Sequence, residues 1–261
     1  MYSHKSKALR PIHCAAILLL VIGSSKAANC QSITNPDLWK WTKHADHLDS
    51  VVQVSMNGSK ATGVIVRVNR DRPKESGFEC LVLTANHVVE PDKGIHPIKV
   101  THRDGSETEC RVIENDDRHD IALLSTWAPN STKPATISTI HVEDKMYLEF
   151  AGLGGGVDLA ESLRHFSGLA TQPTNAEFIY ADQTLLPGDS GGPVFNRRRE
   201  LVGIISGGWF WWDAGIVSPD GVPVLSTWPA RACNIGAIHK LLSGTDSRIE
   251  LASKTDVLVD K

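Results

Sequence analysis

The sequence lacks three features that would mark it as a nucleic-acid-binding protein, a membrane-spanning protein or a cysteine-ligated zinc protein. Its 27 basic residues are outnumbered by 30 acidic ones, so no basic excess is present to bind nucleic acid or an anionic membrane. The apolar stretch of residues 12–23 is too short to span a bilayer comfortably, and no later stretch is long enough either. No C-x-x-C pair occurs, which excludes the usual cysteine zinc site. We therefore expect no nucleic-acid partner, no metal and no cofactor.

The first 27 residues have the pattern of a secretory signal peptide. The apolar stretch is preceded by basic residues, Lys5, Lys7 and Arg10, and is followed by the small residues of Ser25-Lys26-Ala27. We expect cleavage near Ala27, an extracytoplasmic location (secreted or periplasmic) and no membrane attachment after cleavage. Removal of residues 1–27 would leave 23 basic against 30 acidic residues. An uncleaved membrane anchor is the alternative.

Cysteine is scarce, with five residues in the chain. Cys14 lies in the predicted signal peptide, and the four that remain are an even number in an oxidising compartment, where disulfides form. Three pairings are available, and the sequence does not decide among them. We favour Cys30–Cys233 and Cys80–Cys110. A lipoprotein attached through Cys30 is disfavoured because Asn29 precedes it.

Long helical patterns are absent until the end of the chain, and short strand-like segments take their place. These segments are rich in Val, Ile and Leu and are separated by Gly, Pro, Asn and Asp. The first set is Ser50–Met56, Ala61–Val68, Phe78–Thr84, Pro97–Thr101, Glu107–Glu114 and Asp120–Ser125. The second set is Ile137–His141, Met146–Ala151, Arg164–Thr171, Glu177–Ala181, Pro193–Asn196 and Leu201–Ser206, with another strand expected around Val222–Leu225. Six and six short strands predict an all-β fold of two six-stranded antiparallel β-barrels.

The same pattern divides the chain into five parts. The predicted signal peptide, residues 1–27, is followed by an N-terminal arm, residues 28–48. The N-terminal barrel occupies residues 49–128, and the C-terminal barrel with a terminal helix occupies residues 129–244. That helix is expected to start at the N-cap Asn234 and to end at Gly244, with apolar residues at helical spacing, Ile235, Ile238, Leu241 and Leu242. Residues 245–261 are expected to be a loosely held tail.

The segment Pro187-Gly188-Asp189-Ser190-Gly191-Gly192-Pro193 predicts a tight, exposed turn rather than a helix or a core strand. Glycine permits strained backbone angles and leaves no Cβ to block an approaching substrate. In such a turn the Ser190 hydroxyl is a candidate nucleophile, and the N–H groups of Gly188 and Ser190 are a candidate oxyanion hole. An ordinary glycine-rich loop is the alternative.

Two further stretches supply a base and a carboxylate for that serine. His87 follows the apolar strand Cys80-Leu81-Val82-Leu83, and its side chain is suited to general-base chemistry near neutral pH. Asp120 directly precedes another apolar strand, where its carboxylate can accept the second N–H of the histidine. His119 is a competing base in the adjoining loop. Asp116 and Asp117 lie earlier in that polar turn and are expected to be solvated.

In the order histidine, aspartate, serine, the chain resembles the chymotrypsin-fold (trypsin-like) serine endopeptidases, and in particular their bacterial trypsin-like and HtrA-type branch. Three stretches carry the resemblance, T-A-N-H-V-V, D-I-A-L-L and P-G-D-S-G-G-P. It extends over roughly residues 50–243. It implies two barrels with the triad in the cleft between them, His87 as base, Asp120 as orienting carboxylate and Ser190 as nucleophile. It also implies that the strand-like residues Ser206, Gly207 and Gly208 pair with the substrate backbone and line the specificity pocket.

Two departures from the family pattern bear on activation and specificity. No Ile-Val-Gly-Gly-like segment is present to pair with Asp189, so Asp189 must find another partner or stay solvated, and we expect no zymogen activation of that kind. Thr184 takes the position of the pocket-floor aspartate of trypsins. A neutral floor leaves a buried lysine or arginine without a counter-charge, so we expect small or medium uncharged side chains at the cleaved position.

We accordingly expect a secreted serine endopeptidase with polypeptide substrates and no appended PDZ domain in these 261 residues. A catalytically silent binding module on the same fold and an esterase are the alternatives. Gly188–Gly192 also satisfies the G-x-S-x-G pattern of α/β-hydrolases, but that fold needs Asp and then His after the serine. Only His239 follows, within the terminal helix pattern.

Overall fold

The computed structural model describes residues 46–74, 77–89, 96–155, 159, 163–171, 178–181, 183, 185–207 and 230–256. Side chains are described up to residue 245, except those of residues 72–74. Within these ranges no helix has the length and apolar character needed to cross a membrane. The signal-peptide and arm predictions for residues 1–45 lie outside the described residues, as do Cys30 and the expected strand at Val222–Leu225.

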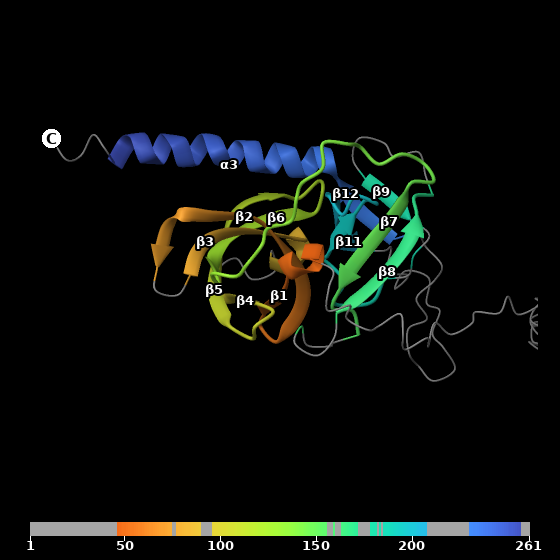
Figure 1. Ribbon diagram of the computed structural model, residues 1–261, viewed down its shortest axis with the longest axis horizontal. Helices are drawn as coiled ribbons and strands as arrows, with labels where there is room; N and C mark the ends of the chain where they lie inside the picture. The colour runs from red at the N-terminus through yellow and green to blue at the C-terminus, as the bar shows by residue number, and fades with distance from the viewer. Residues whose placement is uncertain are drawn as a thin grey trace, which may run out of the picture. The chain divides into compact units, whose positions relative to one another are not determined.

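The first six strands form a closed antiparallel barrel in the order β1-β2-β3-β6-β5-β4 (Figure 1). A short 3-10 helix, η2 (Asp46–Ser50), leads into it. The strands are β1 Val51–Met56, β2 Ser59–Lys74, β3 Gly77–Thr84, β4 Ile98–Thr101, β5 Glu107–Asp116 and β6 Ile121–Ala128. Alternation along β3 explains the packing, since Cys80 and Val82 belong to the barrel core whereas Leu81 and Leu83 belong to a second core.

The remaining six strands form a curled antiparallel sheet in the order β8-β7-β10-β11-β12-β9. They are β7 Tyr147–Gly152, β8 Arg164–Leu169, β9 Phe178–Ala181, β10 Pro193–Phe195, β11 Leu201–Gly207 and β12 Ala230–Asn234. A bridge between Ala170 and Ala181 joins the ends of its two edge strands, β8 and β9. The predicted fold class, two six-stranded antiparallel barrels with a C-terminal helix, is confirmed.

A shared core packs the two barrels against each other. It contains Leu83 and Leu123 from the first barrel and Phe195 and Ile204 from the second, all with 0% exposure. Burial of a large apolar side chain contributes about 1.5–3 kcal/mol, so this interface is a major source of stability. This shared core also places the end of β3 and the start of β6 beside residues 187–192, the turn that precedes β10.

The terminal helix α3 (Ile235–Asp256) begins where the sequence predicts and continues beyond the predicted end. Asn234 is the last residue of β12, and its side-chain oxygen accepts a hydrogen bond from the N–H of Gly236 at 3.4 Å. The four predicted apolar residues are buried in the shared core, and Figure 1 shows the helix running along the first barrel. The expected stop at Gly244 is wrong. An exposed glycine costs a helix only about 1 kcal/mol, and the helix formers Glu250, Leu251 and Ala252 follow it.

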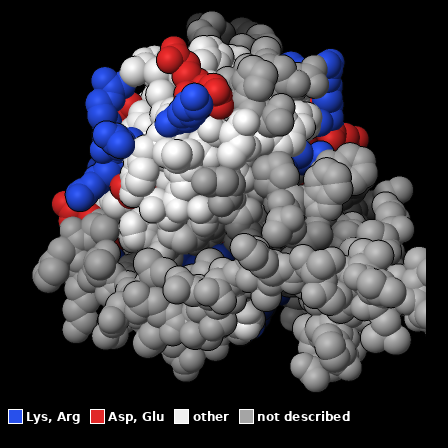
Figure 2. All heavy atoms as spheres, turned by 90° about the vertical axis from the view of Figure 1, so that its right-hand side faces the viewer, with Lys and Arg blue, Asp and Glu red and all other residues white. Residues whose placement is uncertain are grey.

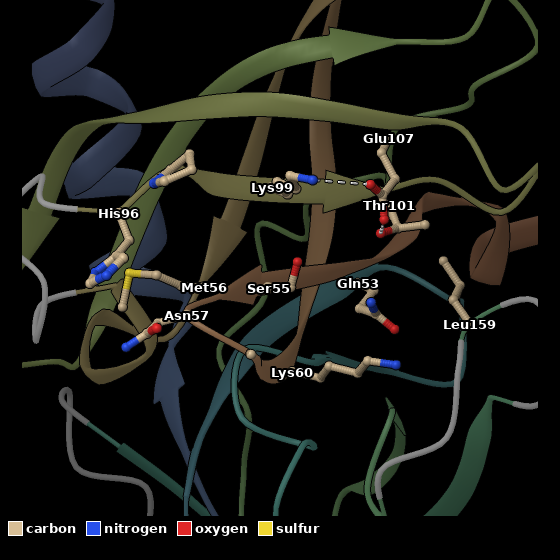
Figure 3. A pocket seen from close by; sticks show the side chains of 12 residues that line it. Gln53, Ser55, Met56, Asn57, Lys60, His96, Lys99, Thr101, Glu107 and Leu159 are labelled. Atoms are coloured by element: carbon tan, nitrogen blue, oxygen red, sulfur yellow. Dashed lines mark hydrogen bonds and ion pairs between the residues drawn. The ribbon is translucent and has the colours of Figure 1, made fainter.

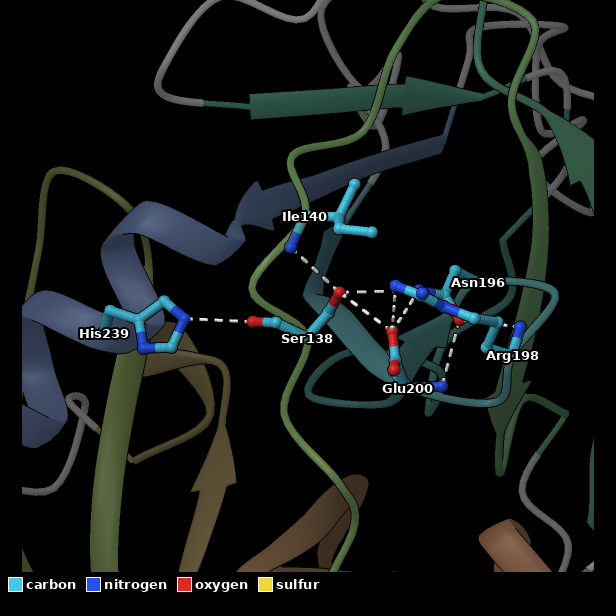
Figure 4. A network of polar contacts seen from close by, with 6 residues as sticks. All are labelled: Ser138, Ile140, Asn196, Arg198, Glu200 and His239. Carbon is cyan, nitrogen blue, oxygen red and sulfur yellow. Dashed lines mark hydrogen bonds and ion pairs between the residues drawn. The ribbon is translucent and has the colours of Figure 1, made fainter.

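The expected strand Ile137–His141 is wrong. Figure 4 shows the side-chain contacts of its Ser138, whose backbone N–H also donates to the carbonyl of Leu201 at 2.9 Å. Ile137 forms only an isolated bridge with Leu201. The Ser138 hydroxyl lies 3.2 Å from a carboxylate oxygen of Glu200 and accepts from the N–H of Ile140 at 3.1 Å. His239 of α3 lies 3.0 Å from the Ser138 carbonyl. The strand that completes the second barrel is instead β12, which the sequence analysis missed.

The expected Cys80–Cys110 disulfide is not formed, and the strand register explains why. Cys80 on β3 lies opposite Thr126 of β6, and Arg111 of β5 lies opposite Ser125. The two cysteines therefore flank β6 from opposite sides, two strand spacings or about 10 Å apart, which is beyond disulfide reach. Both thiols are free, and burial raises the pKa of each to about 12. Cys233 is also free and is fully buried.

Charged side chains of both signs are spread over the described surface. Figure 2 shows Lys and Arg along both sides of this face, a group of both signs near its upper middle, and a largely uncharged centre among its described residues.

Candidate active site

Ser190 lies in a turn whose backbone only glycine can adopt easily. Gly188 and Gly191 have φ angles of +105° and +83°. A Cβ on Gly191 would lie 2.0 Å from the carbonyl oxygen of Thr62, so the turn sits directly against the first barrel. The Pro187 carbonyl accepts from the N–H of Gly155 at 3.0 Å. Because the C=O and N–H of a trans peptide point in opposite directions, the N–H of Gly188 points away from Gly155.

His87 and Asp120 are brought together by the ends of neighbouring strands. His87 lies in the short helix α2 (Asn86–Val89) just after β3, and Asp120 lies just before β6, with which β3 pairs. The carboxylate of Asp120 is 2.8 Å from Nδ1 of His87 and accepts its backbone N–H at 2.9 Å. Asp120 has a φ of +53°, a left-handed conformation that aspartate tolerates better than most residues. This double contact fixes the orientation of the imidazole.

Asp120 is further stabilised as a carboxylate by Ser206 at the end of β11. The Ser206 hydroxyl donates to Asp120 at 2.6 Å and accepts from the guanidinium of Arg231 at 3.0 Å. Burial raises the pKa of Asp120, but the contacts from His87 and Ser206 outweigh it and hold the pKa below its ordinary value. Asp120 is therefore ionised at neutral pH.

His87 and Ser190 line the same hollow, which has a volume of about 410 Å³ and which we call the Ser190 hollow. Gly188 and Pro187 line it from the second barrel, and Met56 and Lys60 line it from the β1–β2 hairpin. A second hollow of about 660 Å³ lies over β1, β4 and β5 and shares Met56 and Lys60 with the first (Figure 3). The two hollows therefore adjoin along the hairpin.

Asp189 points away from the hollow into the protein and is paired with Arg164 of β8. Its side chain has 0% exposure and that of Arg164 has 9%, and Nη1 of Arg164 donates to Oδ2 of Asp189. The N–H groups of Gly154 and Leu186 also donate to this carboxylate, each at 2.8 Å. Burial raises the pKa of Asp189, and Arg164 and the two N–H groups oppose that rise. Of the two expectations for Asp189, another partner is the one found, and that partner is Arg164.

Thr62 of β2 connects the Ser190 turn to both barrels. Its hydroxyl donates to the carbonyl of Gly188 at 2.6 Å and accepts from the N–H of Leu153 at 3.0 Å, and its side chain is fully buried. Its backbone N–H donates to the carbonyl of Ser190 at 2.9 Å. Thr62 therefore holds the turn at two points, at Gly188 and at Ser190 itself.

Thr62→Val is expected to lower the free energy of unfolding. Valine has a similar shape but no hydroxyl, so the N–H of Leu153 and the C=O of Gly188 lose a partner, at a cost of about 1–3 kcal/mol for each buried group left unpaired. Urea unfolding followed by far-UV circular dichroism measures the change. Thr62→Ser keeps the hydroxyl and serves as the control. Equal stability of the valine and serine variants would show that these two hydrogen bonds contribute little.

Asp116 and Asp117, in the polar turn before Asp120, make more side-chain contacts than the sequence predicts. Asp116 contacts Nδ1 of His119 at 2.9 Å and Lys240 at 3.3 Å, so the expectation that it is solvated is wrong. Asp117 is exposed, and it accepts from the amide of Asn86, the residue before His87, at 2.8 Å. His119, the competing base, is thus paired with Asp116 and is not among the residues that line the Ser190 hollow.

The predicted specificity pocket is described only in part. Thr184 and Gly208 lie outside the described residues. Gly207 ends β11 with a φ of +137° and lies opposite Arg231 of β12. Ser206, expected to pair with the substrate backbone, directs its side chain at Asp120 and is 3% exposed. Only its backbone remains a candidate for substrate pairing.

Sequence reasoning missed three residues that support the site, Thr62, Arg164 and Arg231. Arg164 and Arg231 each lie at least 25 residues from the group that they contact, and neither belongs to a recognisable motif. For Arg164 alone a signal was available, since it is a basic residue in a predicted strand and a charge in a barrel strand requires a partner.

A family model described as "Trypsin-like peptidase domain" matches residues 61–204. Among curated proteins, the chain is 30% identical over 148 residues to the serine protease Do-like HtrA of Bacillus subtilis, which covers 51% of this chain and 31% of that protein. It is 31% identical over 149 residues to the periplasmic serine endoprotease DegP of Escherichia coli K12, which covers 54% of this chain and 28% of that protein. The chain thus spans about a third of the length of these relatives.

Solved structures share the fold at low sequence identity. The serine endoprotease from Yersinia pestis superposes with a TM-score of 0.54 at 18% identity, covering 78% of this chain and 67% of that one. The inactive form of Rv3671c from M. tuberculosis H37Rv gives a TM-score of 0.53 at 16% identity, covering 78% and 89%. These similarities show a common chymotrypsin-like fold.

Proposed function

Because this chain belongs to the trypsin-like peptidase family, we propose that it is a serine endopeptidase that cleaves polypeptides through Ser190, His87 and Asp120. One observation carries the proposal above the others. A histidine whose Nδ1 is held 2.8 Å from a partly buried carboxylate lines the same hollow as a serine in a glycine turn. A binding module has no need of that combination.

In the proposed reaction, the Ser190 oxygen attacks the substrate carbonyl while Nε2 of His87 takes the hydroxyl proton. Asp120 keeps the Nδ1 proton of His87 in place and stabilises the imidazolium that forms. The N–H groups of Gly188 and Ser190 donate to the oxyanion. His87 then protonates the leaving amine, and water hydrolyses the acyl-enzyme by the same route. No step needs a metal or a cofactor.

We also propose a substrate preference and a cellular location, each from a few residues or a single relative. A neutral Thr184 favours small or medium uncharged side chains at the cleaved position, with the backbones of Ser206, Gly207 and Gly208 pairing with the substrate. The hollow that adjoins the Ser190 hollow provides room for an extended chain beyond the scissile bond. An extracytoplasmic location is supported by the signal-like residues 1–27 and by the periplasmic DegP relative.

A fluorophosphonate probe tests the nucleophile directly. Attack by an activated serine forms an O–P bond and expels fluoride, so we expect one covalent adduct per folded chain, on the peptide that contains Ser190. Ser190→Ala, which cannot form the adduct, is the control. An absence of labelling in protein with a native circular dichroism spectrum would favour the silent binding module.

The choice of substrate distinguishes an esterase from an endopeptidase. Assays of kcat/KM on small esters and on peptides from an unbiased library, with protein from the same preparation that has not met the fluorophosphonate, compare the two activities. Cleavage within peptides supports an endopeptidase. Ester turnover with no peptide cleavage would assign the site to an esterase and would leave the role of Ser190 intact.

A further inference from the structure

Three side chains from η2 and from strands β7 and β8 of the second barrel form a group with the composition of a metal site. His47 lies in η2, Glu149 on β7 and His165 on β8, and their potential ligand atoms all lie within 4.8 Å of one another. Ala151 lies opposite His165 in the β7–β8 pairing, so Glu149 is a diagonal neighbour of His165 on the same face of the sheet. Glu149 also lies opposite Phe195, whose ring packs edge-on against His47 at 4.9 Å. Strands β7 and β8 therefore bring Glu149 and His165 together on one face, and η2 adds His47 to them.

The distances within the group match those that a tetrahedral zinc ion requires. Oε2 of Glu149 is 3.3 Å from Nε2 of His47 and 3.3 Å from Nε2 of His165. Zinc binds nitrogen and oxygen ligands at about 2.0–2.1 Å, so adjacent ligands of a tetrahedral site lie about 3.3–3.4 Å apart. Two edges of the tetrahedron are thus already at the required length.

His47 supplies an independent indication of a ligand. Its side chain is only 7% exposed, yet neither of its ring nitrogens has a hydrogen-bond partner. The contact with Glu149 is close but lacks hydrogen-bond geometry, and a buried polar group left in this state is costly.

We propose that His47, Glu149 and His165 bind a divalent zinc ion, with water as the fourth ligand. Imidazole and carboxylate together are typical zinc ligands, and His165, 27% exposed, leaves a route from solvent. The ion links η2 to strands β7 and β8. It also fixes the residue next to Arg164, the partner of Asp189. The sequence analysis found no metal site because these three residues are far apart along the chain and follow no ligand spacing.

Titration of the full chain with Zn²⁺ against a chromophoric chelator tests the proposal. We expect one equivalent to bind, and His47→Gln or His165→Gln to weaken it more than about 100-fold, because loss of outer-shell partners alone costs 10–100-fold. Zn²⁺ should raise the Tm of the unchanged protein and have little effect on either variant. His119→Gln is the matched control, since His119 pairs with Asp116 at similar burial but has no third ligand among the residues that the structure describes.

Co²⁺ provides a readout that does not depend on the variants folding. Co²⁺ bound to the unchanged chain should give the intense visible absorption of a tetrahedral site and should be displaced by Zn²⁺. Zinc that is lost in His87→Ala and kept in His47→Gln would place the ion at the His87–Asp120 pair and overturn the proposal. Weak binding that is equal in all variants would overturn it as well.

Discussion

Asp120→Asn is expected to lower kcat for peptide cleavage by about 10⁴-fold at neutral pH while the protein stays folded. Asparagine has a single acceptor oxygen, and it cannot serve the imidazole, the backbone N–H of His87 and the hydroxyl of Ser206 together. Its amide N–H would also face Nδ1 of His87 and favour the tautomer that protonates Nε2. That nitrogen could then no longer accept the proton of Ser190. Initial rates on a peptide substrate, with near-UV circular dichroism as the check on folding, measure the effect.

Asp116→Asn is a matched control for this variant. Asp116 holds His119 in nearly the same way, with contacts to Nδ1 at 2.9 Å and to the backbone N–H at 3.2 Å, but outside the Ser190 hollow. We expect its kcat to stay within a few-fold of the unchanged protein. If both variants lost activity equally, the effect would come from general destabilisation of the turn. If Asp120→Asn kept most of its activity, Asp120 would not be the orienting carboxylate.

The sequence was most informative where the determinants are local. The turn around Ser190 depends on glycines at adjacent positions, and both Gly188 and Gly191 have the positive φ angles that such a turn requires. His87 and Asp120 each adjoin an apolar strand, and short apolar strands separated by turn residues predicted the barrels. The resemblance to the chymotrypsin-like family predicted that His87 and Asp120 meet, and the pairing of β3 with β6 is what brings these two strand ends together.

Prediction failed where a contact depends on register or on a distant partner. The Cys80–Cys110 pairing was wrong because sequence alone does not reveal that β6 lies between β3 and β5. Ile137–His141 has the apolar content of a strand, but most of its backbone pairs with no other strand. The partner of Asp189 was left open, since Arg164 is 25 residues away and identifiable only from the fold of β8.

Arg164→Met is expected to lower the free energy of unfolding by about 3–5 kcal/mol at neutral pH, because it leaves the carboxylate of Asp189 buried without its cation. Methionine retains much of the apolar bulk beside Phe166, over which the guanidinium lies at 4.0 Å. Urea unfolding measures the loss. Arg198→Met is the control, since the Arg198 side chain is 59% exposed and its ion pair with Glu200 should contribute little to stability. Fluorophosphonate labelling of Ser190 should also slow, because Asp189 anchors the turn that holds the nucleophile.

The pH dependence of this loss identifies its cause. Burial raises the pKa of Asp189 in the folded protein, and without Arg164 that rise is opposed only by the N–H groups of Gly154 and Leu186. A carboxyl group whose folded pKa lies above its unfolded value, about 4, stabilises the fold fully below that value. That contribution disappears as the pH rises through the folded pKa. The stability gap between Arg164→Met and the unchanged protein should therefore be smaller near pH 4 than at pH 7. A gap that stays constant or widens toward acid pH would mean that the missing cation is not its cause, and that Arg164 contributes through packing against Phe166 instead.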